Sequence, residues 1–247
     1  MTTLIRASPI ATDLTKLESS SINWPILSGL RFALAVFVLA EHLAVLAPGN
    51  DVLVRWIGQF GGFPSVASFF IISGYCIAHS IENQPVGYVK RRFNRIYPVY
   101  GVAVLLALAP GISFACGHGG VETVLAAFDP ISLLGSLAML QTFLTPPIIG
   151  NGPLWSLSVE FSLYMLAPML LKTGVVAVWS AIAVSLVVYV CLPHFGVHDG
   201  IHQLGHGLPL LASAWLWLLG WMALRSKGRF STAMLVALPV IALRIRQ

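Results

Sequence analysis

The sequence predicts an all-α protein, a polytopic transmembrane helical bundle of seven or eight spanning helices. Of its 247 residues, 57% are hydrophobic and only 9% are charged, whereas a soluble domain carries about 25% charged residues. The apolar residues also gather in runs that approach the roughly 20 residues a membrane-spanning helix needs. The bilayer is therefore the expected solvent, and the length leaves no room for a sizeable soluble domain.

Eight apolar runs define the expected helices. The segment before them, residues 1–26, is mixed and polar and is expected to form an N-terminal cytoplasmic tail, whereas 27–247 forms the transmembrane domain. Three widely spaced cysteines offer neither a disulfide framework nor a paired zinc motif. The runs cover residues 27–46, 64–81, 96–114, 131–144, 154–171, 175–192, 208–224 and 232–243.

Two basic segments predict the orientation, because basic loops tend to remain in the cytoplasm. The cluster at 90–95 follows two spans, which places the N-terminus inside as well. The second basic segment, 225–229, is also inside only if the short run 131–144 does not fully cross the membrane. Seven spans satisfy the charge rule, and a complete crossing by 131–144 would give eight and place that segment outside.

The first span contains three ionisable residues, which are costly inside a membrane and are candidates for function. Arg31 and His42 are separated by close to three helical turns and are expected on nearly one face, about 16 Å apart along the axis. Glu41 points about a quarter-turn away. An imidazole can take a proton from a hydroxyl near neutral pH. The alternative is that Arg31 reaches the membrane interface and His42 lies near water.

A second anomaly is Glu160, within the apolar run 154–171 and four residues before Tyr164 on the same helix face. Its carboxylate could orient an imidazole or bind a substrate hydroxyl, or it could simply pair two helices. Arg92 and Arg95, three residues apart, are expected on one face, and guanidinium groups suit phosphate. Their alternative role is to keep a positive loop inside.

Four histidines recur at intervals of four residues, which in a continuous helix would form a ladder of metal ligands. Nearby proline and glycine residues interrupt that helix, so a polar loop is favoured and no metal site is predicted. The histidines are His194, His198, His202 and His206.

Four sequence blocks, which occur in order over residues 28–168, resemble the acyltransferase 3 family of membrane O-acyltransferases. Ser28 stands where many family members have Asp. The family also has more spans than this chain contains, so the chain is expected to be incomplete at its C-terminus. The blocks are Ser28-Gly29-Leu30-Arg31 with Glu41-His42, Phe69-Phe70-Ile71-Ile72-Ser73-Gly74-Tyr75, Arg91-Arg92-Phe93-Asn94-Arg95-Ile96-Tyr97-Pro98, and Trp155-Ser156-Leu157-Ser158-Val159-Glu160 with Tyr164 and Pro168.

The resemblance implies transfer of an acyl group, usually acetyl, from acyl-CoA to a hydroxyl of a surface or exported carbohydrate in the bacterial inner membrane. No cofactor and no nucleic acid partner are expected. His42 would be catalytic, supported by Glu41 or Glu160. Binding of donor and substrate would fall to Arg31, Arg92, Arg95, Ser73, Trp155 and Tyr164.

Two other functions remain compatible with the sequence. A secondary transporter also uses intramembrane Glu and His as a proton relay, although no two related halves are visible here. A truncated family member could keep these blocks without catalysing a reaction.

Overall fold

The computed structural model describes residues 24–46, 52, 62–118, 129–145, 152–196 and 205–225. Within these ranges the chain forms seven α-helices and one short 3-10 helix, with no strand, which confirms the all-α prediction. The chain divides into two units, Met1–Gly62 and Phe63–Gln247, and each is described by itself. The predicted tail up to residue 23 and the terminal run 232–243 lie outside the described residues.

The N-terminal unit contains helix α2 (Trp24–Leu46), which holds the first predicted span. Its 23 residues extend about 35 Å at 1.5 Å per residue. This length exceeds the roughly 30 Å of bilayer hydrocarbon.

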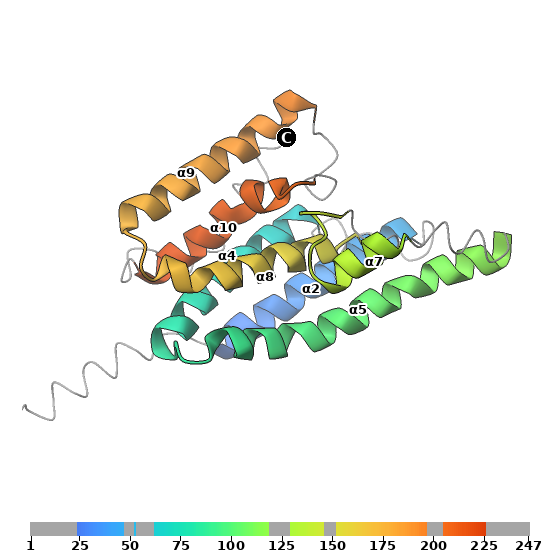
Figure 1. Cartoon of the computed structure of the whole chain (residues 1–247), viewed down its shortest axis with the longest axis horizontal. Coiled ribbons are helices and arrows are strands. Elements are labelled where there is room, and N and C mark those ends of the chain that lie inside the picture. The colour runs from blue at the N-terminus through green and yellow to red at the C-terminus, as the bar shows by residue number, and fades with distance from the viewer. Residues whose placement is uncertain are drawn as a thin grey trace, which may run out of the picture. The chain divides into compact units, whose positions relative to one another are not determined.

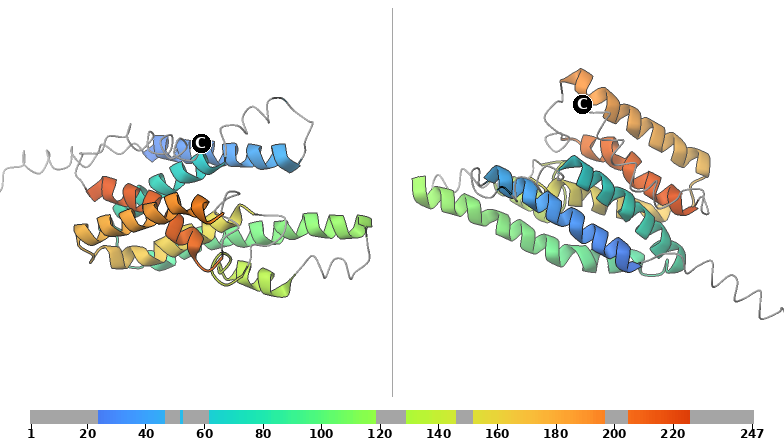
Figure 2. Two further views of the ribbon diagram at one scale, coloured as in Figure 1. Left: turned by 90° about the horizontal axis from the view of Figure 1, so that it is seen from above. Right: turned by 180° about the vertical axis from the view of Figure 1, so that it is seen from behind.

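The second unit is a bundle in which α10 lies between α4 and α9 (Figure 1). Two further directions show the same order (Figure 2). Helix α8 packs on α4 and α5, and the short α7 lies along α5. The helices of this unit are α4 (Phe63–Asn83), α5 (Tyr88–His118), α7 (Pro130–Leu137), α8 (Leu154–Leu170), α9 (Val175–Cys191), the 3-10 helix η2 (Leu192–Phe195) and α10 (Leu208–Arg225).

Four of the described helices are long and apolar enough to cross a membrane. The qualifying segments are Pro25–His42, Phe63–Asn83, Val175–Phe195 and Leu208–Arg225. On α9 large apolar side chains face outward, among them Val176 at 80% and Val187 at 60% exposure. A helix that stays apolar on its exposed side has lipid for its surroundings, and the chain is an integral membrane protein.

The tightest contact in the bundle joins α4 to α10 through two glycines. A Cβ atom at Gly74 would lie 1.9 Å from the carbonyl oxygen of Trp217, and one at Gly220 would lie 1.9 Å from that of Ile71. Only glycine fits at either position, so the two backbones meet directly. Small residues permit this approach between membrane helices, where packing rather than hydrophobic burial drives association.

The predicted run 131–144 contains only the eight helical residues of α7, about 12 Å of helix. Asp129 begins this helix by accepting hydrogen bonds from the backbone N–H groups of Ile131 and Ser132. After Leu137 the chain turns, with positive φ at Met139 (57°) and Thr142 (75°). We name residues 138–145 the polar turn. Because eight helical residues are too few for a crossing, this run does not span the membrane as one helix.

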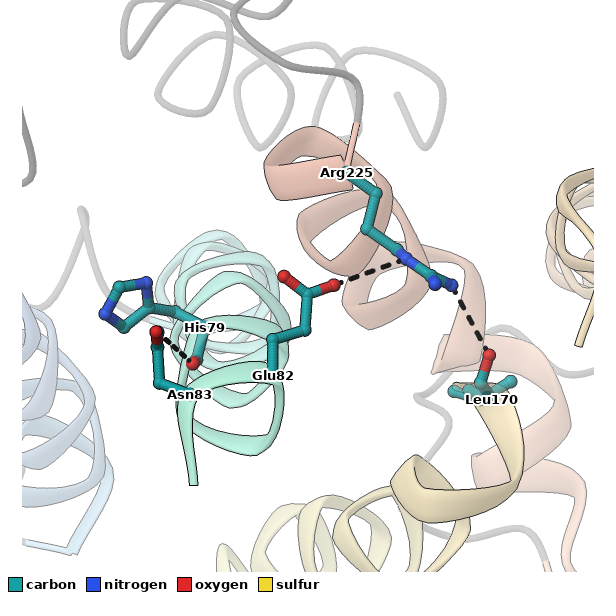
Figure 3. Close-up of polar contacts among 5 residues, drawn as sticks. All are labelled: His79, Glu82, Asn83, Leu170 and Arg225. Atoms are coloured by element: carbon teal, nitrogen blue, oxygen red, sulfur yellow. Dashed lines mark hydrogen bonds and ion pairs between the residues drawn. The ribbon is translucent and has the colours of Figure 1, made fainter. Parts of the chain in front are cut away.

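The ends of three helices meet in one place, shown in Figure 3. Arg225 at the end of α10 forms an ion pair with Glu82 near the end of α4, at 3.4 Å between Nε and Oε1. Its Nη1 also donates to the carbonyl oxygen of Leu170, the last residue of α8, at 3.4 Å. The imidazole of His79 points away from this pair. Both partners are partly exposed, so the pair itself contributes about 1 kcal/mol or less.

The start of α5 lies at the same end of the bundle, because Arg92 donates from Nη2 to the hydroxyl of Ser80 on α4. The first basic segment and Arg225 therefore share one end, which we name the basic end. This arrangement agrees with the sequence-based alternative in which 131–144 does not fully cross.

Gly74→Ala or Gly220→Ala should destabilise the protein, because the new methyl group would overlap a backbone carbonyl. We expect a loss of about 1–3 kcal/mol or more in unfolding free energy, measured as a lower midpoint of thermal unfolding in detergent. Gly101→Ala on α5 is the matched control, since nothing lies within 4 Å of its would-be Cβ. Equal midpoints for all three variants would refute the backbone contact.

Candidate functional site

Three polar side chains meet in the interior of the bundle and form what we name the polar centre: Ser73 of α4, and Glu160 and Tyr164 of α8. Glu160 Oε1 accepts hydrogen bonds from the Ser73 hydroxyl and from Tyr164 Oη, the latter at 2.5 Å. The two hydroxyl oxygens are themselves 2.7 Å apart. Exposure is 0% for Ser73, 3% for Glu160 and 4% for Tyr164.

The sequence explains why these groups converge. Glu160 and Tyr164 are four residues apart and share one face of α8. That face packs on α4, where Ser73 directly precedes the glycine that meets α10. A buried carboxylate is costly unless it accepts hydrogen bonds, and two hydroxyl donors meet that need here.

The polar centre is chemically equipped to hold protons. An ionised Glu160 brings no proton, so the two hydroxyl protons must serve three short contacts. A protonated Glu160 would supply the third proton without any movement of the oxygen atoms. The arrangement can therefore take up or release a proton inside the bundle.

Trp155 lies on α8 before Glu160 and packs edge-on against Phe70 of α4, with ring centroids 6.3 Å apart. It is 8% exposed and belongs to the same hydrophobic core as Tyr164. Trp155 therefore forms part of the apolar wall around the polar centre, and substrate binding by its indole remains a prediction.

The two arginines of α5 have different surroundings. Arg92 is half-buried, donates to Ser80 and lies over the ring of Tyr88, with Cζ 5.7 Å from the ring centroid. Arg95, one turn later, is exposed. Their shared helix face agrees with the sequence, but only Arg92 is drawn into the bundle.

The remaining candidates, Arg31, Glu41 and His42, all lie on α2 in the N-terminal unit. Nδ1 of His42 is 2.7 Å from the carbonyl oxygen of Val38, one turn earlier. Because a carbonyl only accepts, Nδ1 carries the proton and Nε2 is left as the basic nitrogen. Within the same unit, the Glu41 carboxylate lies against the backbone of Gly62, where a Cβ would be 2.5 Å from Oε1.

Sequence reasoning missed a second group of buried polar residues, centred on Gln141 in the polar turn. Gln141 Nε2 donates to Tyr100 Oη of α5 at 2.6 Å and to the carbonyl oxygen of Leu154 at 3.1 Å. Tyr100 Oη in turn donates to the carbonyl oxygen of Ser136 at 2.5 Å. The available signal was a lone glutamine inside a run otherwise treated as a weak span.

Of the histidine ladder, His194 is exposed in η2 and His206 precedes α10. His198 and His202 lie outside the described residues, so the expected polar loop is described only at its edges.

Apolar spanning helices around a buried carboxylate, with basic side chains at one end, define a membrane protein whose interior is equipped for chemistry. The chain belongs to the acyltransferase 3 family, whose model, described as an acyltransferase domain, matches residues 24–245. No solved structure matches the chain.

Two curated relatives give the range of similarity. The chain is 29% identical to "Acyltransferase MdmB" of Streptomyces mycarofaciens over 217 residues, which is 81% of this chain and 53% of that protein. It is 27% identical to "Protein 2 in picA locus" of Rhizobium radiobacter over 161 residues, which is 60% of this chain and 78% of that protein. The chain thus spans about half the length of the first of these relatives.

Ser73→Ala and Tyr164→Phe should each remove one hydrogen bond to the Glu160 carboxylate and lower the unfolding free energy by about 1.5–3 kcal/mol. The double variant should lose at least about 0.5 kcal/mol more than the sum, because both hydroxyl donors to one buried oxygen are then gone. Thermal or denaturant unfolding of the four proteins in a double-mutant cycle measures this coupling. Strict additivity would contradict a shared polar centre.

Proposed function

We propose that the chain is a membrane-embedded O-acyltransferase that moves an acyl group, expected to be acetyl, from acyl-CoA to a hydroxyl of a cell-surface or exported carbohydrate. Membership of the acyltransferase 3 family supports this reaction class. The observation that carries the proposal is the ring of His42, which binds Val38 through Nδ1 and leaves Nε2 available as a base.

In the proposed reaction, His42 Nε2 removes the proton from the acceptor hydroxyl as its oxygen attacks the thioester carbonyl. The C–O bond forms, the C–S bond breaks, and the CoA thiolate takes the proton from the imidazolium. The products are the O-acyl sugar and CoA. A carboxylate supports the imidazolium, with Glu41 or Glu160 as the candidates, and a covalent acyl-protein intermediate is the alternative route.

Donor binding is assigned to the arginines. Guanidinium groups bind phosphate through paired hydrogen bonds, which suits Arg31, Arg92 and Arg95 to the phosphates of CoA. Arg92 is held by Ser80 and Tyr88, whereas Arg95 is exposed and accessible from outside the bundle.

The orientation follows from the same charges. The basic end is placed in the cytoplasm, where acyl-CoA is made, and the N-terminus lies on that side. The bacterial inner membrane is the proposed location, and the bundle keeps water from hydrolysing the thioester.

His42→Ala should abolish glycan O-acylation while the protein remains at normal levels in the membrane. The measurement is the O-acyl content of surface glycan from a deletion strain restored with either the wild-type or the variant chain. His194→Ala is the matched control, because this histidine is exposed in η2. Undiminished acylation by His42→Ala would remove His42 from the mechanism. Uptake of an unmodified solute into vesicles without acyl-CoA would favour a transporter.

Arg92→Gln should raise the KM for acyl-CoA about tenfold, because one charge-assisted hydrogen bond to phosphate is lost. Its kcat should change little if the contact is equal in the ground and transition states. Lys172→Gln, an exposed lysine just after α8, is the control for a general loss of positive charge. An unchanged donor KM for Arg92→Gln would limit this arginine to orientation and packing.

A further inference from the structure

We propose that the polar turn (residues 138–145), together with Ser136, binds the acceptor through uncharged hydrogen-bonding groups, as the acceptor subsite of the membrane enzyme. The assignment of a sugar as the ligand rests on the function proposed above. The physical observation is a cluster of open polar atoms in a packed interior.

Four polar atoms of this segment are buried and have no hydrogen-bond partner in the described part of the structure. They are Ser136 Oγ, Gln141 Oε1, Thr142 Oγ1 and Thr145 Oγ1. Ser136 and Gln141 are 0% exposed and Thr142 is 1% exposed. Native proteins leave few such groups, because each was hydrogen-bonded to water before folding. A cluster of four on one segment therefore indicates a missing partner with several polar groups.

The segment is fixed in place, although it is not helical. Gln141 is anchored through Nε2 to Tyr100 and to the backbone of Leu154, which leaves Oε1 as its open acceptor. Thr145 lies against α7, where its Oγ1 would be 2.1 Å from a Cβ at Gly135. The four open groups are thus presented by an ordered scaffold.

The backbone of the polar turn is also strained. Thr142 has a φ of 75°, a value that β-branched residues rarely adopt. Non-helical backbone at membrane depth is tolerated where it is buried in protein or lines a polar cavity. Strain of this kind persists where the surroundings enforce it, and it clusters at ligand sites.

The polar turn lies at the end of the bundle opposite to the basic end. The carbonyl oxygen of Thr142 accepts from the N–H of Gly207, just before α10, whereas Arg225 at the other end of α10 reaches Glu82. The 18 residues of α10 separate these contacts by about 25 Å. Helix α8 repeats the pattern, since Leu154 accepts from Gln141 and Leu170 accepts from Arg225.

The open groups match the chemistry of a sugar. One amide oxygen and three hydroxyls are uncharged and can both accept and donate, as the hydroxyls of a carbohydrate do. A phosphate would require the cations found at the opposite end. Glu160 lies six residues beyond Leu154, about 9 Å along α8, so an acceptor seated at the polar turn would approach the polar centre from the side opposite to the donor.

Thr142→Val and Thr145→Val test the subsite, because valine keeps the shape and the β-branching and removes only a hydroxyl without a described partner. Removal of an unpaired buried hydroxyl should leave the thermal midpoint unchanged or raise it. The acceptor is the glycan fraction extracted from the deletion strain, added to purified protein in nanodiscs with radiolabelled acetyl-CoA. The apparent KM for glycan should rise about tenfold in each variant, with the KM for acetyl-CoA unchanged.

Ser213→Ala is the matched control, because this buried serine has a partner, the carbonyl oxygen of Pro209 on its own helix. It should lower the thermal midpoint slightly and leave both KM values unchanged. An unchanged glycan KM in the two threonine variants would overturn the acceptor subsite.

A binding measurement separates this inference from the reaction itself. The same glycan fraction should raise the thermal midpoint of the wild-type and His42→Ala proteins, and it should not raise that of the doubly substituted Thr142→Val/Thr145→Val protein. Stabilisation without acyl transfer by the wild type would contradict the proposed reaction and keep the subsite. No stabilisation of the wild-type protein, or an equal shift in the double variant, would overturn the subsite.

Discussion

The direct backbone contact between α4 and α10 is the constraint on which the second unit depends. Gly74 and Gly220 each face a carbonyl oxygen of the other helix, so neither can be replaced by a larger residue without separating the pair. This contact fixes the rotation of α4, and Ser73, the residue before Gly74, is thereby turned toward α8. The hydrogen bonds to Glu160 follow from a packing requirement located one residue away.

The bundle has two chemically different ends. At the basic end Arg225 joins the ends of α4, α8 and α10, and Arg92 ties the start of α5 to α4. At the opposite end uncharged groups of the polar turn contact α5, α8 and the start of α10. The polar centre lies between them on α8. Such a division suits a reaction that brings an anionic donor and a neutral acceptor together from opposite sides of a membrane.

Several particular residues could be predicted from the sequence because their signal is local. Glu160 and Tyr164 share a helix face by their spacing alone, and the structure confirms their hydrogen bond. The apolar runs that became α2, α4, α9 and α10 were recognisable by length and composition. Gln141 was missed, since a single amide in an apolar run looks like a tolerated polar residue until its partners on α5 and α8 are known.

The sequence by itself determined the helical class, the positions of the long helices and the identity of the ionisable groups in them, because these depend on residue type and on intervals within one helix. Only the tertiary structure decided that Ser73 meets a carboxylate 87 positions away, that the run 131–144 folds into a short helix and a turn, and that Arg92 and Arg95 differ in burial. Each of those outcomes depends on packing between helices distant in the chain, where the fit of a glycine or the position of a carbonyl group decides which side chains can meet.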